Sequence, residues 1–164
     1  MKQLLYIFLF SLFLTGCSSS KNLSNRQAER ETTALLREAN RHIGTRYQPG
    51  GASPRGFDCS GFVQYTYKQI GYTLPRTTAQ QSAVGINVNR KNLQQGDLVF
   101  FTGNNAKSGN VGHVGIITET HRNGRFSFIH STTSAGVRVD NSENSYWKPR
   151  YLKARRVIGH QPKR

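Results

Sequence analysis

The sequence predicts an α+β fold in which N-terminal helices pack on an antiparallel β-sheet. In the first half of the chain, apolar residues recur at helical spacing and glycines follow them. From Gly96 onward the pattern changes to short β-branched or aromatic runs that Gly and Asn clusters separate. Helices followed by strands, without regular alternation of the two, are typical of an antiparallel sheet.

The N-terminus predicts export and lipid attachment. Lys2 precedes an apolar run over residues 4–14, which is well short of the roughly 20 residues of a membrane-spanning helix and is typical of a signal peptide. Leu14-Thr15-Gly16-Cys17 then resembles the bacterial lipoprotein signal, whose cysteine is acylated before cleavage. We therefore expect a signal peptide over residues 1–16 and a lipid on Cys17. Ser18, where an Asp would indicate the inner membrane, resembles outer-membrane sorting.

A flexible tether is expected to join the lipid to the domain. Residues 17–29 include a Ser- and Asn-rich stretch without apolar periodicity, and residues 30–164 form the domain. Ser24 and Gln27 resemble a capping box at the start of the first helix. Four apolar residues form the stripe of this helix, which Gly44 can end: Leu35, Leu36, Ala39 and Ile43.

The second helix is predicted to begin at a cysteine. Residues 47–57 hold two Pro and three Gly, which favour a loop. Asp58 can cap a helix over residues 59–70, and Gly71 can end it. A short third helix is expected over residues 77–84. The buried stripe of the second helix is Phe62, Val63, Thr66 and Ile70.

Five short runs predict the strands of the sheet. Each is rich in β-branched or aromatic residues and is bounded by turn residues. The runs cover residues 97–101, 113–118, 125–131, 137–140 and 155–158.

The charge of the chain predicts an anionic environment or partner. Lys and Arg number 23 against 8 Asp and Glu, which gives a formal net charge of +15. Nucleic acid is the usual partner of so basic a protein, but export argues against it, and the sequence has no zinc-ligand spacing and no basic–aromatic run. Cell-wall polymer and lipopolysaccharide are the better candidates. A basic surface that serves no particular partner remains an equal alternative.

Cys59 is the candidate nucleophile. The chain has two cysteines, so Cys59 is the thiol that remains once Cys17 carries lipid, and an unpaired thiol in an exported protein indicates reactivity. A thiol is nucleophilic as thiolate, and the first turn of a helix lowers its pKa. The alternative is an inert buried cysteine, to which an Asp-Cys-Ser-Gly sequence is poorly suited.

Two of the five histidines are candidates for the general base. His113 and His130 both lie in predicted strands, which the turn at residues 122–125 could place side by side. An imidazole beside Cys59 would activate the thiol and later protonate the leaving amine. The other histidines fall on the polar face of a helix, beside a turn or in the basic tail: His42, His121 and His160.

Five motifs follow one another over residues 43–158. They are Asp58-Cys59-Ser60-Gly61-Phe62-Val63, Leu74-Pro75-Arg76-Thr77-Thr78, Gly96-Asp97-Leu98-Val99-Phe100-Phe101, His113-Val114-Gly115-Ile116 and Phe128-Ile129-His130-Ser131. In this order they resemble the NlpC-type bacterial cell-wall cysteine peptidases. Each motif alone is weak evidence, whereas the ordered set is specific. With a lipoprotein signal in front, the chain is similar to the enterobacterial murein endopeptidase lipoproteins of that family.

The resemblance implies a fold and a catalytic triad. The fold is a minimal papain-like one, in which the nucleophile helix packs on an antiparallel sheet. The triad comprises Cys59 as nucleophile, His113 as general base and acid, and His130 as the residue that orients His113. No metal or cofactor is implied.

The resemblance also implies residues around the triad and a substrate. Tyr47 matches a tyrosine beside the oxyanion site, and Asp58 and Ser60 match positions that bind the free amine or the carboxylates of the substrate in some relatives. The substrate is peptidoglycan, cleaved at D-γ-glutamyl–meso-diaminopimelate or at crosslinks that contain diaminopimelate.

Two other functions stay open on the sequence. The same thiol could serve an amidase that cuts between N-acetylmuramic acid and L-alanine, or an acyltransferase, because a triad of this kind serves any acyl transfer. A lipoprotein that binds the wall without cleaving it is the alternative outside enzymes. In each case we expect a monomer at the periplasmic face of the outer membrane that contacts peptidoglycan and no nucleic acid.

Overall fold

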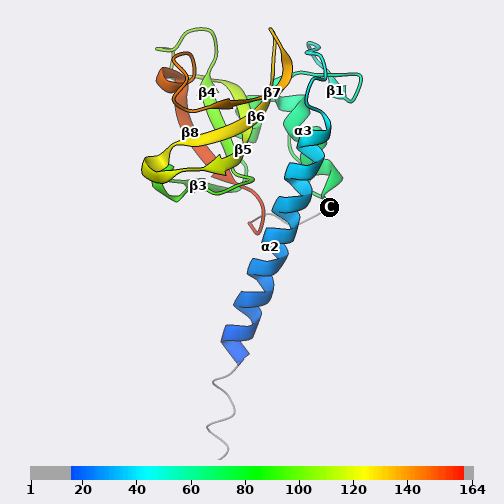
Figure 1. Cartoon of the computed structure of the whole chain (residues 1–164), viewed down its shortest axis with the longest axis vertical. Helices are drawn as coiled ribbons and strands as arrows, with labels where there is room; N and C mark the ends of the chain where they lie inside the picture. Colours follow the sequence, from blue (N-terminus) through cyan, green and yellow to red (C-terminus); the bar gives the residue numbers. More distant parts are fainter. Residues whose placement is uncertain (1–15, 161–164) are drawn as a thin grey trace, which may run out of the picture.

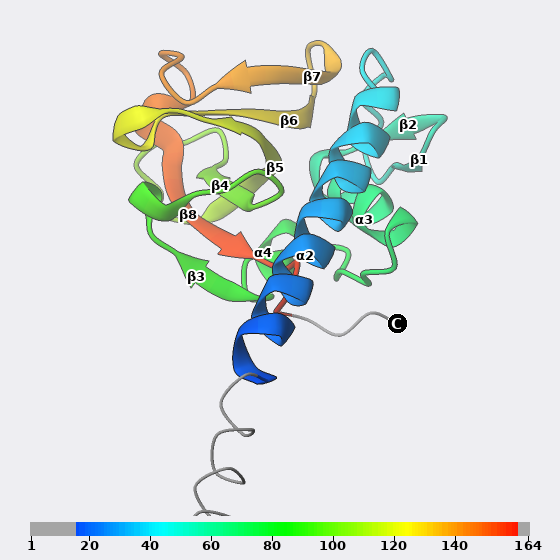
Figure 2. The same ribbon diagram turned by 60° about the horizontal axis from the view of Figure 1, so that its bottom comes forward.

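The computed structural model describes residues 16–160 of the chain. Its helices lie beside an antiparallel sheet (Figures 1 and 2), which confirms the α+β prediction. Residues 1–15, which make up nearly all of the expected signal peptide, lie outside the described residues, as do residues 161–164. The helices are α2 (Gly16–Arg41), α3 (Cys59–Gln69) and α4 (Thr78–Gln81), with short 3-10 helices η2 (Arg90–Asn92), η3 (Arg122–Gly124) and η4 (Lys148–Arg150).

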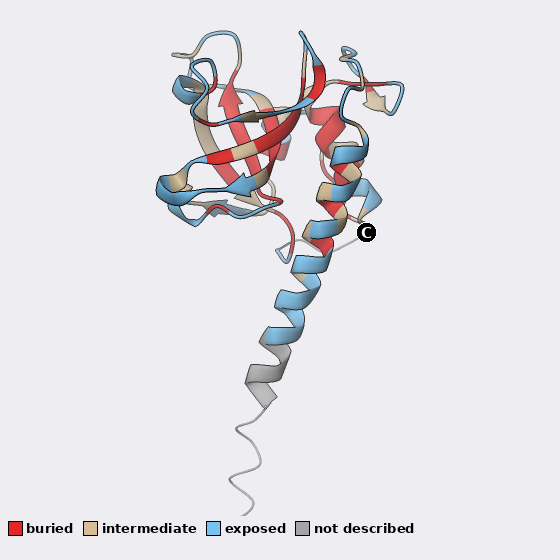
Figure 3. Cartoon of the chain, viewed as in Figure 1, coloured by how far each residue is buried: buried red, intermediate tan, exposed pale blue. Residues whose placement is uncertain are grey.

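Helix α2 is longer than the sequence predicts. It is continuous from Gly16, so the prediction of a flexible tether over residues 17–29 is wrong, and Ser24 does not begin a helix. The physical reason is that residues 17–41 contain neither Pro nor Gly, so nothing interrupts the helix. Its first half projects from the domain (Figure 1), and residues 22–27 within it are exposed (Figure 3). The helix ends at Arg41, and Ile43 beyond it is 54% exposed, not buried as predicted.

The second half of α2 packs against the domain. Leu35 and Ala39 are fully buried in the core that α3 shares with the sheet. One turn earlier, the Tyr72 hydroxyl donates to the Glu31 carboxylate over 2.7 Å. These contacts hold the second half of α2 next to α3 (Figure 2).

Six strands form the sheet in the spatial order β3-β8-β4-β5-β6-β7, and every neighbouring pair is antiparallel. The strands are β3 (Ile86–Val88), β4 (Leu98–Thr102), β5 (Val111–Thr120), β6 (Phe126–Thr132), β7 (Gly136–Asn141) and β8 (Tyr151–Arg156). Two further strands of two residues each, β1 (Ala52–Ser53) and β2 (Gly56–Phe57), pair within the predicted loop.

The sequence pattern misplaces one strand and misses another. Residues 155–158 were expected to be a strand, whereas β8 covers Tyr151–Arg156 because its pairing with β4 extends back to Tyr151, opposite Phe101. Val157 and Ile158 continue into the core instead. The sequence does not predict strand β3, because this edge strand has only three residues and its side chains are mostly exposed.

The inner strands of the sheet are buried on both faces, and many of their residues are coloured as buried in Figure 3. One face packs on the helices through a core that includes Phe100, Val114 and Ile129. The opposite face carries a second apolar cluster that Trp147 and Tyr151 help to cover: Leu93, Val99, Phe101, Ile117, Phe126, Phe128, Trp147 and Ala154. Burial on two sides explains why β4 reads as a continuous apolar run rather than an alternation.

A buried ion pair joins the residue before β4 to the end of β8. Asp97, 1% exposed, accepts from the guanidinium of Arg156 through both carboxylate oxygens, each at 2.8 Å. The burial of this carboxylate removes its hydration, and two charge-assisted hydrogen bonds from Arg156 replace the lost water. Next to it, the Tyr67 hydroxyl of α3 donates to the Gly96 carbonyl. The start of β4 is therefore held by both β8 and α3.

Helix α3 begins where the sequence predicts. The Asp58 carboxylate accepts from the backbone N–H of Gly61 over 2.7 Å, which caps the first turn. The carbonyl of Gly51 in the preceding loop lies against this turn, so a Cβ on Gly61 would come within 2.0 Å of it. Gly61 thus lets the loop that precedes Cys59 pack directly on the nucleophile helix.

No helix among residues 16–160 is long and apolar enough to cross a membrane.

The close approach at Gly61 predicts a stability defect in the variant Gly61→Ala. The added methyl must displace the backbone of Gly51, and we expect a loss of about 1–3 kcal/mol in the free energy of unfolding, measured by urea denaturation. Gly103→Ala is the matched control, because its Cβ would meet only the Gly112 Cα at 3.7 Å. Equal stability of the two variants would contradict the packing described here.

Candidate active site

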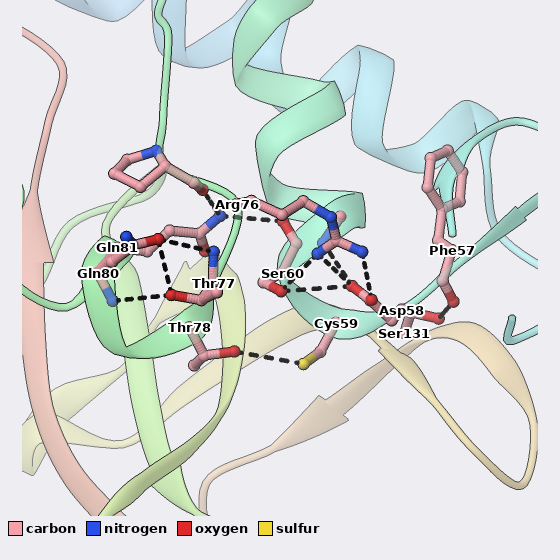
Figure 4. A network of polar contacts seen from close by, with 12 residues as sticks. Phe57, Asp58, Cys59, Ser60, Arg76, Thr77, Thr78, Gln80, Gln81 and Ser131 are labelled. Carbon is pink, nitrogen blue, oxygen red and sulfur yellow. Dashed lines mark hydrogen bonds and ion pairs between the residues drawn. The ribbon is translucent and has the colours of Figure 1, made fainter. Parts of the chain in front are cut away.

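Cys59 is the first residue of α3 and is a partly buried free thiol. Its Sγ lies 3.6 Å from the hydroxyl of Thr78, the first residue of α4 (Figure 4). Thr78 comes close because α4 begins with a capping box between Thr77 and Gln80. The sequence places Thr78 in a motif, but no pattern in it indicated a contact with the thiol.

Burial sets the protonation of Cys59 and raises the pKa of its thiol. The hydrogen bond with Thr78 and backbone hydrogen bonds with Ser60 and Val114 lower the pKa, while the charge of Asp58 raises it. The balance lies above the ordinary value, so the resting site holds a thiol. The expectation that the helix end would lower the pKa of this thiol is therefore wrong, because desolvation is the larger effect.

The two predicted imidazoles lie in contact. His113 on β5 and His130 on β6 point their rings toward each other, with Nε2 of His113 2.8 Å from Nδ1 of His130. The prediction that paired strands would bring these side chains together is confirmed. Gly115 leaves the room they need, because a Cβ there would come within 2.6 Å of the Phe128 ring and 3.2 Å of the His130 Cβ.

Asp140 and Trp147 extend this contact, and the sequence did not indicate either. Nε2 of His130 lies 3.0 Å from Oδ2 of Asp140 on β7. The indole N–H of Trp147 donates to the same oxygen over 3.0 Å. The Trp147 ring also stacks on His113, with centroids 4.8 Å apart and planes 28° apart. Asp140 carries no local signal, because β7 reads as an ordinary strand, and Trp147 lies between the last two predicted strands.

Both imidazoles are neutral in the resting site. The pKa of His113 falls from 6.5 to about 3, first because of burial and then because of the neighbouring His130, while Asp140 opposes the shift. Burial also lowers the pKa of His130 in spite of its bond to Asp140. For Asp140, burial raises the pKa, but hydrogen bonds from His130 and Trp147 outweigh it and leave the pKa below its usual value.

The thiol and the imidazole share a cavity of about 390 Å³. Cys59, His113 and Asp140 all line it, together with Arg138 of β7. Tyr47, the tyrosine expected near the oxyanion site, is on the same wall, and its burial and the charge of Cys59 raise the pKa of its hydroxyl. The remaining lining residues are mainly polar and come from the ends of β4 and β6, the start of β5 and the loops after β4, β6 and β7.

Asp58 and Ser60 do not line this cavity. Both are held by Arg76, whose guanidinium binds the Asp58 carboxylate through two nitrogens and donates to the Ser60 hydroxyl over 2.9 Å (Figure 4). The Asp58 carboxylate also caps α3. The structure therefore gives these residues a part in fixing the start of the nucleophile helix, and it does not support the expected contact with substrate.

The other three histidines lie outside the cavity, as the sequence predicts. His42 contacts Glu38 over 3.2 Å at the end of α2, His121 is near Glu119 at a turn, and His160 is exposed. Cys17 is the second residue of α2, and its side chain is not among those described.

The NlpC/P60 family matches residues 44–156. The chain is 45% identical over 117 residues to the murein DD-endopeptidase MepS/murein LD-carboxypeptidase of Escherichia coli, which covers 70% of this chain and 57% of that protein. It is 35% identical over 156 residues to the probable endopeptidase NlpC of E. coli, covering 92% and 97%. The chain thus spans little more than half of MepS and nearly all of NlpC.

Solved structures agree with this relationship. An NlpC/P60 family protein from Bacillus cereus superposes with a TM-score of 0.69 at 32% identity, over 77% of this chain and 40% of that one. The family match covers more than half of the chain, and it includes Cys59, His113 and His130. The chain therefore belongs to the NlpC/P60 family and has its papain-like fold.

Proposed function

We propose that this protein is a cysteine-type peptidase that cleaves peptide bonds of peptidoglycan. The observation that supports it most is the cavity that Cys59 and His113 both line, with His130 bonded to His113 behind it. A nucleophile, a base and a group that orients the base are the components that acyl transfer requires. The names of the relatives, MepS and NlpC, support the same activity.

In the proposed mechanism Cys59 attacks the carbonyl carbon of the scissile bond. Its proton passes to His113, whose Nε2 is occupied by His130 and whose Nδ1 is therefore the nitrogen that can accept. Backbone N–H groups at the start of α3 and the Tyr47 hydroxyl stabilise the oxyanion. His113 then returns the proton to the leaving amine, and water hydrolyses the thioester by the same route in reverse.

At rest Cys59 is a thiol and His113 is a neutral imidazole, so bound substrate must favour the transfer of the proton from Cys59 to His113. Substrate displaces water from the cavity, and a proton moved from Cys59 to His113 creates an ion pair next to Asp140, which stabilises the imidazolium through His130. The negative charge develops near the first turn of α3, where the helix dipole is favourable.

The proposed substrate is the stem peptide or its crosslink. Bonds that contain diaminopimelate, either D-γ-glutamyl–diaminopimelate or a crosslink, carry free carboxylates that suit the half-exposed Arg138 on the cavity wall. The DD-endopeptidase name of MepS favours the crosslink. Asp58 and Ser60 contribute in this proposal by holding Arg76 and the start of α3.

The proposed location is the periplasmic face of the outer membrane, with acyl chains on Cys17. The support is the sequence at residues 14–18 and the excess of basic residues, which suits an anionic envelope. The same features favour a monomer that contacts peptidoglycan and the membrane, with no part for nucleic acid.

Replacement of the nucleophile tests the mechanism. Cys59→Ser should lower hydrolysis of purified sacculi by roughly three orders of magnitude or more, because an alcohol is a far weaker nucleophile than the thiol here. Mass spectrometry of the released muropeptides identifies the bond, and an amidase would leave a different new amine. The variant should keep its melting temperature and its binding to sacculi. Undiminished hydrolysis by Cys59→Ser would refute the mechanism.

The buried imidazoles predict a loss of stability in acid. The His113 imidazole titrates near 6.5 when unfolded and at about 3 when folded, so between these pH values the unfolded chain binds more protons. The free energy of unfolding should therefore fall as pH is lowered through this range, by up to about 1.4 kcal/mol per pH unit for this group. His113→Gln should flatten the slope, whereas the exposed control His121→Gln should retain it. Urea melts at several pH values measure both slopes.

Replacement of each cysteine by serine in turn separates membrane anchoring from catalysis. Cys17→Ser, exported by a conventional signal peptide, should leave the membrane fraction, lose incorporation of labelled palmitate and still digest sacculi at the wild-type rate, because α2 begins far from the cavity. Cys59→Ser is the reciprocal control and should stay in the membrane fraction without activity. Retention of Cys17→Ser in the membrane fraction would contradict the lipid anchor.

A further inference from the structure

The hydrogen bonds around Asp140 point to a role that the cysteine and two histidines do not explain. Asp140 lies opposite Phe128 in the β6–β7 register, two residues along from the pair formed by His130 and Arg138. Its Oδ2 is 3.0 Å from His130 and 3.0 Å from the indole nitrogen of Trp147, and its Oδ1 is 2.7 Å from the guanidinium of Arg138. A carboxylate only accepts, so each of these three neighbours donates.

The direction of the first bond fixes the proton on His130. Because Asp140 accepts, His130 carries its proton on Nε2, and the Nδ1 of this neutral ring is then a bare acceptor. The nitrogen that faces Nδ1 at 2.8 Å is Nε2 of His113. That nitrogen must donate, so His113 also carries its proton on Nε2.

The tautomer of His113 decides whether this ring can accept the proton of Cys59. With its proton on Nε2, neutral His113 has a free lone pair on Nδ1, which is the nitrogen that can accept the proton of Cys59. The opposite set of tautomers would reverse every bond: His130 would donate from Nδ1, and His113 would hold a proton on Nδ1 and could not act as base. Two neutral imidazoles by themselves could adopt either set of tautomers. The Asp140 carboxylate excludes the set in which Nε2 of His130 carries no proton, because a carboxylate cannot donate to it.

We propose that Asp140 is a positioning residue that selects, through His130, the tautomer in which His113 can accept the proton of Cys59. The proposal rests on the proposed cysteine peptidase function and adds the group that gives the His113–His130 pair its direction. Trp147 supports it from two sides, because its indole donates to Asp140 and its ring stacks on His113. Arg138 holds the second oxygen of the carboxylate and keeps the first aimed at His130.

Nuclear magnetic resonance of the histidine nitrogens tests the proposal without any substrate. Long-range proton–nitrogen spectra of the wild-type domain should show the Nε2–H tautomer for both His113 and His130 at neutral pH. A wild-type protein in which His113 carries its proton on Nδ1 would overturn the proposal, and this result does not depend on any variant being folded.

Asp140→Asn tests the cause. The amide can turn either its oxygen or its nitrogen toward His130, so both tautomers become accessible, and the spectra should show a mixture or a reversal. Glu143→Gln is the matched control for the spectra, because it makes the same carboxylate-to-amide change three residues along the chain, at a side chain whose ionic partners are Arg90 and Lys148. Unchanged tautomers in Asp140→Asn would refute the assignment.

Alkylation of Cys59 by iodoacetamide at neutral pH measures the consequence. In Asp140→Asn the rate should fall in proportion to the share of His113 whose proton moves to Nδ1, by about twofold for an equal mixture and roughly tenfold or more for a reversal, because that share has lost its general base. A tautomer change with no change in alkylation would also overturn the proposal, because it would show that the direction of the pair does not reach the thiol. Failure of the proposed function would appear separately, as an absence of peptidoglycan cleavage in a protein whose spectra and alkylation are as expected.

Discussion

The packing of α3 on the sheet is the constraint on which the candidate site depends. The thiol comes from the first residue of a helix, and the imidazoles come from two strands on the other side of the core, so their distance is set by everything packed between them. Phe62 and Val63 of α3 share one core with Val114 and Ile129 of the sheet. The Ser131 hydroxyl, next to His130, donates to the Phe57 carbonyl over 2.8 Å and ties β6 to the segment before the nucleophile.

A second consequence of this packing is electrostatic. The elements that bring Cys59 and His113 together also exclude water from them, and exclusion of water disfavours both charged forms. The site is therefore neutral at rest, in contrast to a preformed thiolate–imidazolium pair. Its polar contacts gain strength in the same low dielectric, so the bonds between His113, His130 and Asp140 have more influence here than they would at a surface. Proton transfer from Cys59 to His113 therefore depends on bound substrate.

The sequence predicted the parts of the molecule that local rules determine. The start of α3 followed from Asp58, its end from Gly71, and four of the sheet strands from β-branched and aromatic runs. The union of His113 and His130 followed from two neighbouring strands and a turn. Asp140, Thr78 and the pairing of Asp58 with Arg76 could not be read in this way, because each depends on register between segments distant in sequence. The length of α2 does not follow from its pattern, because the polar composition of residues 17–29 is typical of a flexible segment. The same residues contain no Pro or Gly to break a helix.

The length of α2 has a mechanical meaning. A 26-residue helix is about 39 Å long, whereas the same residues extended could span roughly twice that distance and could also coil up to much less. If the chain is held in the bilayer at the start of this rod, the cavity works at a nearly constant radius from the membrane, set by the number of helical turns. Each residue added to or removed from the rod would alter that radius by about 1.5 Å and rotate the mouth of the cavity by about 100°. Depth in the envelope and the direction in which the cavity opens are then coupled through one stiff element.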